Sequence, residues 1–191
     1  MSGVDTRGLF TGLVALVAVE RLWELRLARR NASRLLARGG VEVGAGHYPW
    51  MVGLHTAFLA SSLAEVWLLG RPFLPVLAVV ALAALALASG LRAWAIQTLG
   101  ERWTTRVIVL PGAARVVSGP YRYLAHPNYL AVALEIAALP LVHGAWMTAV
   151  LFSSLDGALL AHRIRTEESA LDGSRAVRAE VALGGAGEEG R

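Results

Sequence analysis

The chain has 191 residues, of which 55% are hydrophobic and 17% charged, with a formal net charge of +4 at pH 7. This composition is too apolar for an ordinary soluble domain of that length and favours a single membrane-embedded domain. Cysteine is absent and the five histidines lack metal-ligand spacing, so we expect neither a disulfide nor a metal site.

Five hydrophobic segments predict an all-α, polytopic integral membrane protein, because a helix needs about 20 apolar residues to cross a bilayer core. The first segment runs from Leu9 to about Leu27 and is marginal, since its apolar part ends at Val19. A signal peptide is the alternative, but the positive charge follows the apolar run instead of preceding it. The other predicted spans are 49–69, 74–99, 128–142 and 145–161, the last two forming a close hairpin.

The distribution of arginine predicts the orientation. All 18 basic residues are arginine, and all but three lie in segments 20–47 and 99–126 or after the fifth span. The positive-inside rule therefore puts these segments in the cytoplasm and the N-terminus outside. Such arginines contact anionic headgroups, so we expect membrane lipids and no nucleic acid as partners. We expect one domain over residues 1–172 and a disordered cytoplasmic tail over residues 173–191.

A dense polar and aromatic cluster lies between the third and fourth spans. Residues 102–109 alternate weakly and are expected to form a short extended stretch, followed by a turn at Pro111-Gly112. The His126-Pro127 pair opens the fourth helix, because proline favours the first helical position. Free N–H groups at that end favour a carboxylate, and the nearby tyrosines offer flat faces for an aromatic ring. An interfacial aromatic belt explains these residues equally well.

A second polar cluster lies on the fifth helix and its extension. Asp156, Arg163 and Glu167 recur at helical spacing and therefore share one face. Asp156 lies inside an apolar span, where an ionisable group is a functional candidate. A solvated helix end with an ion pair between Arg163 and Glu167 is the alternative.

Ionisable residues also lie inside other predicted spans. Arg92 either extends to the cytoplasmic face or lines a pocket for an acidic or phenolic headgroup, with Trp94 and Gln97 near it. Glu65 and Glu135 are expected either to be protonated or to pair with Arg92.

Two motifs carry a family resemblance. The first is VVSGPYRYLAHPNY over residues 116–129, and the second is RIRTEESAL over residues 163–171. Together they resemble the isoprenylcysteine carboxyl methyltransferase family over roughly residues 85–172. Members are integral membrane enzymes that use S-adenosylmethionine. The resemblance implies a cofactor pocket at the cytoplasmic ends of the last helices, capped by the C-terminal segment.

The resemblance also implies roles for individual residues. Cofactor binding is implied for Ala113, Ala114, Arg115, Val116, Tyr121, His126, Pro127, Asn128, Tyr129, Glu167 and Glu168. Arg163 would face the acceptor and steady its oxygen, with Arg92, Trp94 and Gln97 completing the predicted acceptor site. His126 is the nearest candidate base. Family members usually carry arginine before the His-Pro pair, and Ala125 stands there in this chain, with Arg122 as a partial replacement.

The run AWAIQTLGERWTTR over residues 93–106 is typical of a bacterial branch, which implies the bacterial inner membrane. Members of that branch are associated with type III polyketide synthases and methylate alkylpyrones or alkylresorcinols. The resemblance therefore implies a lipophilic phenol or enol as acceptor, with a prenylcysteine carboxyl as the alternative. A non-catalytic lipid-binding or scaffolding protein is a different hypothesis, which Ala125 favours. A small transporter is disfavoured because repeated halves are absent.

Overall fold

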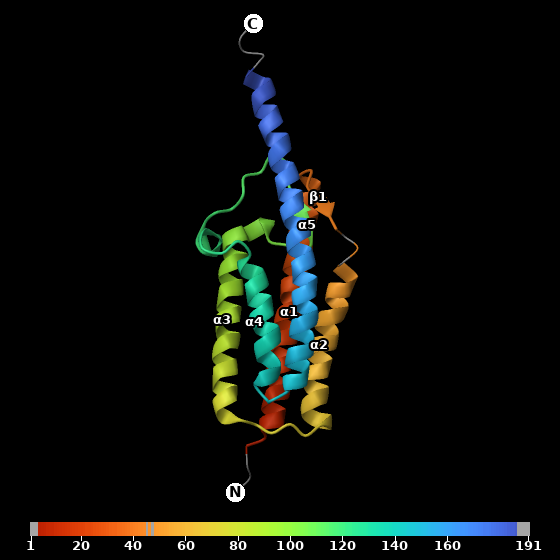
Figure 1. Ribbon diagram of the computed structural model, residues 1–191, viewed down its shortest axis with the longest axis vertical. Coiled ribbons are helices and arrows are strands. Elements are labelled where there is room, and N and C mark those ends of the chain that lie inside the picture. Colours follow the sequence, from red (N-terminus) through yellow and green to blue (C-terminus); the bar gives the residue numbers. More distant parts are fainter. Residues whose placement is uncertain (1–3, 45, 47, 187–191) are drawn as a thin grey trace.

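The computed structural model describes the backbone of residues 4–44, 46 and 48–186, and the side chains of these residues as far as residue 170. Helices make up most of this part of the chain (Figure 1). They are α1 (Thr6–Ala37), α2 (Tyr48–Leu68), α3 (Pro75–Leu99), α4 (Pro127–Leu141) and α5 (Trp146–Ala186). The predicted spans 49–69, 74–99 and 128–142 match α2, α3 and α4 to within one residue at each end, whereas the first and fifth spans cover only parts of the longer helices α1 and α5.

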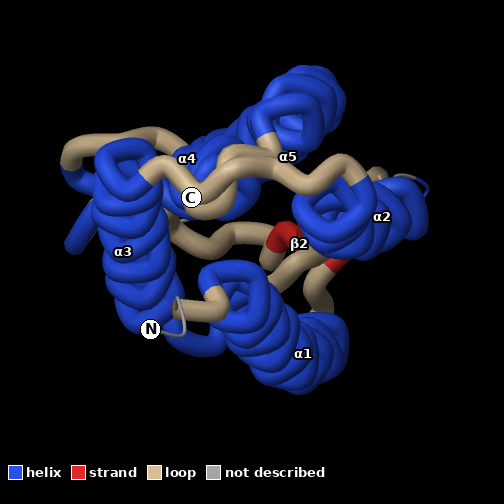
Figure 2. The backbone as a smooth tube through the Cα atoms, turned by 90° about the horizontal axis from the view of Figure 1, so that it is seen from below, coloured by secondary structure: helices blue, strands red, loops and turns tan. Residues whose placement is uncertain are grey.

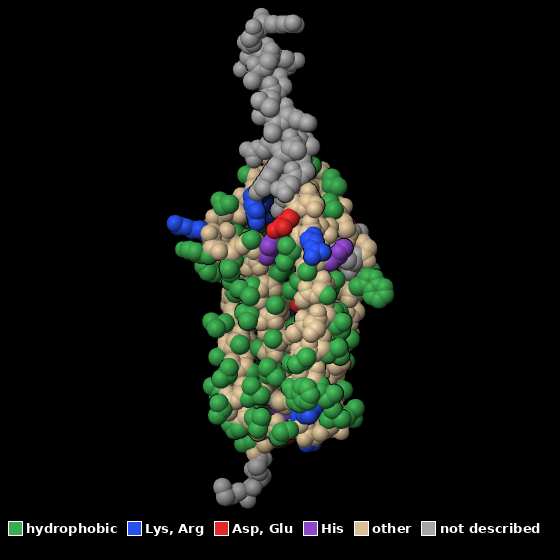
Figure 3. Space-filling view, in the orientation of Figure 1, with side chains coloured by type: hydrophobic (Ala, Val, Ile, Leu, Met, Phe, Trp, Pro, Cys, Tyr) green, Lys and Arg blue, Asp and Glu red, His purple; other side chains and the backbone are tan. Residues whose placement is uncertain are grey.

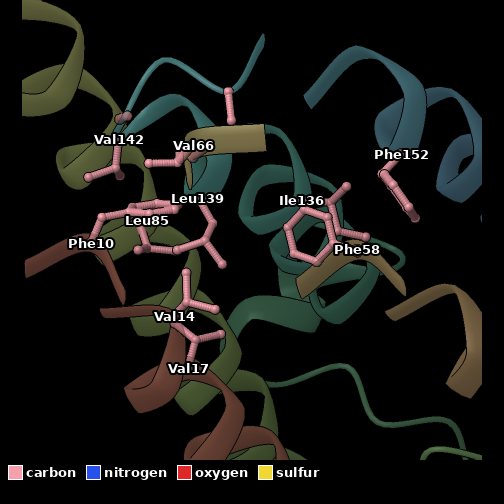
Figure 4. Packing of buried hydrophobic residues seen from close by; sticks show 13 residues of the cluster. Phe10, Val14, Val17, Phe58, Val66, Leu85, Ile136, Leu139, Val142 and Phe152 are labelled. Carbon is pink, nitrogen blue, oxygen red and sulfur yellow. The ribbon is translucent and has the colours of Figure 1, made fainter. Parts of the chain in front are cut away.

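The five helices run roughly along one axis, with α4 packed between α3 and α5 (Figure 1). Seen along that axis, α3, α4, α5 and α2 form an arc, and α1 lies across its open side (Figure 2). A hydrophobic core fills the space between them (Figure 4). Its largest buried members are Phe10, Phe58, Leu85, Ile136, Leu139 and Phe152.

The prediction of an all-α fold misses a small sheet. Strands β1 (Val41–Val43) and β2 (Val107–Val109) pair in antiparallel register, with Val41 opposite Val109. The extended stretch predicted within residues 102–109 is confirmed by β2. What the sequence did not reveal is its partner, which follows α1 and lies more than 60 residues earlier.

The outer surface of the bundle is apolar along most of its length. Figure 3 shows hydrophobic side chains over the middle of one face, with charged and histidine side chains gathered mainly near the end from which α5 emerges. Two described helices, Tyr48–Leu68 and Pro75–Arg102, are long and apolar enough to cross a membrane. Exposed apolar surface of this extent indicates contact with lipid or a partner.

The turns α2–α3 and α4–α5 meet at one end of the bundle, which we call the hairpin end (Glu65, Arg71, Met147 and Thr148). Gly144 has φ +68, and a Cβ there would lie 2.8 Å from the Pro72 carbonyl oxygen. Only glycine therefore allows the two turns to approach this closely.

At the hairpin end, Glu65 connects the two turns. It accepts hydrogen bonds from the backbone N–H groups of Met147 (3.1 Å) and Thr148 (2.6 Å) at the start of α5. It also accepts from Arg71 Nε at 2.8 Å. The alternative that Glu65 pairs with Arg92 is wrong, because the cation that Glu65 contacts is Arg71 in the adjacent α2–α3 turn.

Two helices extend well beyond the predicted spans. At 1.5 Å per residue, the 32 residues of α1 reach about 48 Å, against a bilayer core of about 30 Å. The backbone of α5 continues as a helix to Ala186 and projects past the bundle (Figure 1). Residues 187–191 and the side chains from 171 onward lie outside the described part, so the disorder of the tail over residues 173–191 stays a prediction.

Candidate functional site

The arginine-rich half of α1 supports the segment between α3 and α4. Asn31 is buried and donates from Nδ2 to the Trp103 carbonyl oxygen at 2.9 Å. Arg34 and Arg38 pair with the two carboxylate oxygens of Glu101 at 2.7 and 2.8 Å. Together with the β1–β2 sheet, these contacts fix the loop that leads to the first motif. The C-terminal half of α1 thus stabilises the conformation of the α3–α4 segment, although the two are far apart in the sequence.

The first motif is held against α3 by a glycine. Gly119 opens the short 3₁₀ helix η3 (Gly119–Arg122) with φ +54, and a Cβ there would lie 2.3 Å from Thr98 Oγ1. The close approach is therefore possible only without a side chain. His126 then caps α4 and Pro127 is its first residue, which confirms the predicted helix start.

The two motifs meet where α4 begins and α5 passes it. Tyr129 donates its hydroxyl to Glu167 Oε2 at 2.6 Å. The His126 ring stacks on the Tyr129 ring with centroids 5.3 Å apart, and its Nε2 lies 3.2 Å from Glu168 Oε1. The Arg163 guanidinium lies over the Tyr129 ring, with its central carbon 5.4 Å from the ring centroid.

Arg163 is held by neutral groups. Its Nη2 donates to the Thr105 carbonyl oxygen at 2.9 Å, and its Nη1 contacts Met51 Sδ. Among the described residues it makes no ion pair, and its Nε has no hydrogen-bond partner, although the residue is only 5% exposed. The alternative of an ion pair between Arg163 and Glu167 is therefore wrong, and the guanidinium remains available to a ligand.

Three cavities meet at this cluster. The first, which we call the loop cavity, has a volume of about 300 Å³ and lies between the loop, η3 and α5. It is lined mainly by residues of the first motif and the segment before it. Its lining includes Ala113, Ala114, Arg115, Val116, Tyr121, Ala125 and Glu167.

The second cavity, the junction cavity, has a volume of about 110 Å³ and shares lining residues with both of the others. It shares Tyr121 and Glu167 with the loop cavity. It shares Asn128, Tyr129 and Arg163 with the third cavity. His126 also lines it. The three cavities therefore form a series along the end of α5.

The third cavity, the bundle cavity, has a volume of about 380 Å³ and extends between the helices. All five helices contribute to its predominantly apolar wall. Exposed Leu22 and Val52 stand at its rim on α1 and α2. Its polar lining residues include Arg21, Glu24, His55, Arg92, Asp156 and Arg163.

Charged residues of the bundle cavity are mostly paired. Arg21 Nη1 lies 2.6 Å from Glu24 Oε2, and Arg92 is paired with Glu135. Of the two alternatives left open for Glu135, pairing with Arg92 is the one that the structure shows, with Arg92 buried in the bundle. Arg21 and Glu24 were not predicted as site residues; their only sequence signal was charge directly after an apolar run.

Tyr121 stands between the loop and junction cavities and has a shifted pKa. Burial raises the pKa of its hydroxyl to about 12, and the nearby Glu167 carboxylate acts in the same direction. Tyr121 therefore remains a protonated hydrogen-bond donor throughout the physiological range.

Not every predicted site residue lines these cavities. Trp94 is 47% exposed, Gln97 is also exposed, and neither lines any of the three cavities. Pro127 is buried within the start of α4, and Glu168 is exposed and contacts the site through His126. Beyond Glu167 and Glu168, the described backbone of α5 continues past the site, so a cap formed by the C-terminal segment stays a prediction.

Comparison with known proteins identifies relatives of this chain. Residues 78–173, just over half of the chain, match the model of the isoprenylcysteine carboxyl methyltransferase (ICMT) family. The chain is 38% identical over 164 residues to the uncharacterized protein YpbQ of Bacillus subtilis, covering 85% of this chain and 96% of that protein. It is 28% identical over 158 residues to an uncharacterized protein of Haemophilus influenzae, covering 82% and 91% respectively. No solved structure matches the chain.

Proposed function

This chain belongs to the isoprenylcysteine carboxyl methyltransferase family, and on that premise we propose that it transfers a methyl group from S-adenosylmethionine to an oxygen of a lipophilic acceptor. The family is one of methyltransferases, and the family together with the apolar helices points to a membrane protein. The donor, the acceptor and the cytoplasmic position of the site are the parts that we propose.

The loop and junction cavities fit the methyl donor. Their combined lining offers a carboxylate at Glu167, a hydroxyl donor at Tyr121 and polypeptide backbone at 113–116. Asn128 Oδ1 is buried and lacks a hydrogen-bond partner among the described residues, so it is available to a ligand donor. The volume of the loop cavity alone is at the lower end of the roughly 300–1,000 Å³ that small-molecule sites occupy.

The bundle cavity fits an amphiphilic acceptor. Its wall is largely apolar, its rim includes exposed side chains of α1 and α2, and its inner end is marked by Arg163 and Tyr129. An alkyl chain from the bilayer would lie along the apolar wall, while a polar head would meet Arg163. Alkylpyrones and alkylresorcinols have this form, and a prenylcysteine carboxylate is the alternative acceptor. A functional link to a type III polyketide synthase, which makes such ring lipids, belongs to the same proposal.

When bound, S-adenosylmethionine would supply a methyl group on a sulfonium sulfur. The acceptor oxygen would bond to the methyl carbon, the electrons of the carbon–sulfur bond would pass to sulfur, and the acceptor hydroxyl would lose its proton. The protein then contributes mainly by orientation, which lowers such barriers substantially. Arg163 stabilises negative charge on the acceptor oxygen and favours its ionised form. Tyr129 and Glu167 hold the junction between donor and acceptor, and His126, which lines the junction cavity, is the proposed acceptor of the departing proton.

The observation that carries this proposal is the position of Arg163. It lines both the junction cavity and the bundle cavity, is buried, and has no carboxylate partner among the described residues. A buried guanidinium left without a charged partner is costly unless a ligand completes it.

A turnover assay tests the proposal. Purified protein in detergent would receive S-adenosylmethionine with a labelled methyl group and one acceptor at a time: an alkylpyrone, an alkylresorcinol or a farnesylated cysteine. We expect label in the extracted lipid with at least one ring acceptor. Binding of S-adenosylmethionine without transfer to any acceptor would instead support a non-catalytic lipid-binding protein, for which Ala125 is the sequence argument.

A further inference from the structure

Asp156 has no role in the methyl transfer described above, yet it is among the most buried residues of the molecule. It lies on α5 at 1% exposure and lines the bundle cavity. Its Oδ1 has no hydrogen-bond partner among the described residues. A buried acceptor without a partner costs about 1–3 kcal/mol, and more when charged, so its presence calls for an explanation.

Charge pairing around the bundle cavity singles out the same residue. Five charged residues line that cavity, and Arg21, Glu24 and Arg92 each have an oppositely charged partner within 4 Å. The two that remain without one, within the described part of the chain, are Asp156 and Arg163. They carry opposite charges and face the same cavity.

The geometry of α5 relates these two residues. They are seven positions apart, two helical turns on one face, or about 10 Å along the axis. Helical side chains lean toward the N-terminus of their helix, so the Arg163 guanidinium is directed toward the level of Asp156. A polar head bound at Arg163 would therefore meet Asp156 at its deeper side.

We infer that Asp156 binds a second oxygen of the acceptor, located deeper in the bundle cavity than the oxygen that receives the methyl group. This inference rests on the proposed function and narrows its acceptor to a head group that carries a second oxygen. A lipid with one polar group would leave Asp156 unpaired. A site built to hydrogen-bond a substrate oxygen discriminates strongly against an analogue that lacks it, because the protein group is then left alone.

Two lipids that differ in one oxygen test this inference. The probes are 5-pentadecylresorcinol, with two ring hydroxyls, and 3-pentadecylphenol, with one. Their affinities for the purified protein would be measured by quenching of tryptophan fluorescence, which does not require turnover. We expect wild type to bind the resorcinol on the order of 10- to 100-fold more tightly, the range for one hydrogen bond to a charged group.

Variants of Asp156 locate the source of the preference. Asp156→Leu should reduce the affinity ratio to about one while leaving the phenol nearly unaffected. Asp156→Asn should keep only part of the ratio, because the amide still accepts a hydrogen bond but a bond to a neutral group contributes less than one to a charged group. Ser154→Ala, an exposed change on the same helix, should keep all of it.

Two outcomes would overturn the inference: equal affinities for the two lipids in wild type, or an unchanged affinity ratio in Asp156→Leu, including the case in which both affinities fall by the same factor. If Asp156→Leu does not fold, Asp156→Asn takes its place, and an undiminished ratio in that variant would overturn the inference. The proposed function fails in a different way. Neither lipid would then be methylated by wild type, even though the binding preference and its loss in Asp156→Leu are observed.

Discussion

The two ends of the α4–α5 hairpin both bury charged groups but treat them differently. At the hairpin end, Glu65 accepts from Arg71 and from two backbone N–H groups, so both of its oxygens are used. At the other end, Asn128, Asp156 and Arg163 each have a buried polar atom without a hydrogen-bond partner in the described part of the chain, and all three line cavities. The comparable atom at the hairpin end, His143 Nδ1, lines none of the three cavities.

This difference separates a structural role from a binding role. Buried polar groups in proteins are nearly always hydrogen-bonded, and a satisfied network rigidifies the fold. A group of unsatisfied atoms around cavities is better explained by a ligand that completes them. The hairpin end should therefore control stability, and the opposite end should control binding and turnover.

The largest expected effect on stability is at the hairpin end. Glu65→Ala leaves Arg71 without its carboxylate and removes the acceptor for two N–H groups at the start of α5. Breaking a buried pair in this way costs about 3–5 kcal/mol in the free energy of unfolding. Unfolding in detergent measures it.

The control for that variant is Glu42→Ala, which removes the partner of Arg106 in a more exposed ion pair at 3.2 Å. Its cost should be below about 1 kcal/mol. Equal losses in the two variants would remove the distinction between the ends.

The next effect is on turnover at the site end. Arg163→Lys keeps the charge but loses the planar fork that contacts Thr105 and faces the bundle cavity. Removing one positioned hydrogen-bond donor typically costs about 100-fold or more in kcat. We expect a loss of that order in methyl transfer, with S-adenosylmethionine affinity changed less than about threefold. The exposed neighbour Arg165→Lys should behave as wild type, and equal activity of the two variants would contradict the role of Arg163.

A smaller effect should follow from restoring the family's usual residue. Ala125 lines the loop cavity and is exposed. Ala125→Arg adds a cation there, and an exposed ion pair contributes about 0.2–1 kcal/mol, or up to roughly fivefold in affinity for S-adenosylmethionine. Calorimetric titration measures the gain. Leu124→Arg adds the same charge next to it and should give less; an equal gain would indicate a nonspecific charge effect.

The smallest effect concerns alkaline pH. The pKa of Tyr121 is raised by burial from 10 to about 12, so the folded state keeps a proton that the unfolded state loses. Stability therefore falls as pH rises from about 10 to about 12, and is not affected by this group below that window. The melting temperature of Tyr121→Phe should fall less steeply with pH in that window than that of wild type. Tyr123→Phe, at an exposed position, should match wild type; identical slopes for all three would contradict the shift.

Much of the fold could be predicted because it depends on local sequence. Apolar length specified the helices, and His126-Pro127 specified the start of α4. The β1–β2 pairing and the contact of Asn31 with Trp103 could not be predicted, because each joins segments far apart in the chain. Such pairings depend on packing that no local pattern records.

The prediction that Trp94 lies beside Arg92 at the acceptor site did not take helix geometry into account. At about 100° per residue, Trp94 points roughly 200° away from Arg92 on the same helix. Since Arg92 is buried in the bundle, Trp94 faces outward, as its exposure confirms. The same rule kept Asp156, Arg163 and Glu167 together. A periodicity check along α3 would have removed Trp94 from the predicted acceptor site.

Binding of S-adenosylmethionine to the purified protein tests the central claim most directly. Titration calorimetry would compare wild type with Glu167→Ala, which removes the carboxylate shared by the loop and junction cavities, and with the folded fraction of Glu65→Ala. We predict saturable binding of S-adenosylmethionine to wild type. The affinity of folded Glu65→Ala should lie within about threefold of the wild-type value, whereas Glu167→Ala should bind at least about 10-fold more weakly. Unchanged affinity in Glu167→Ala would contradict the account.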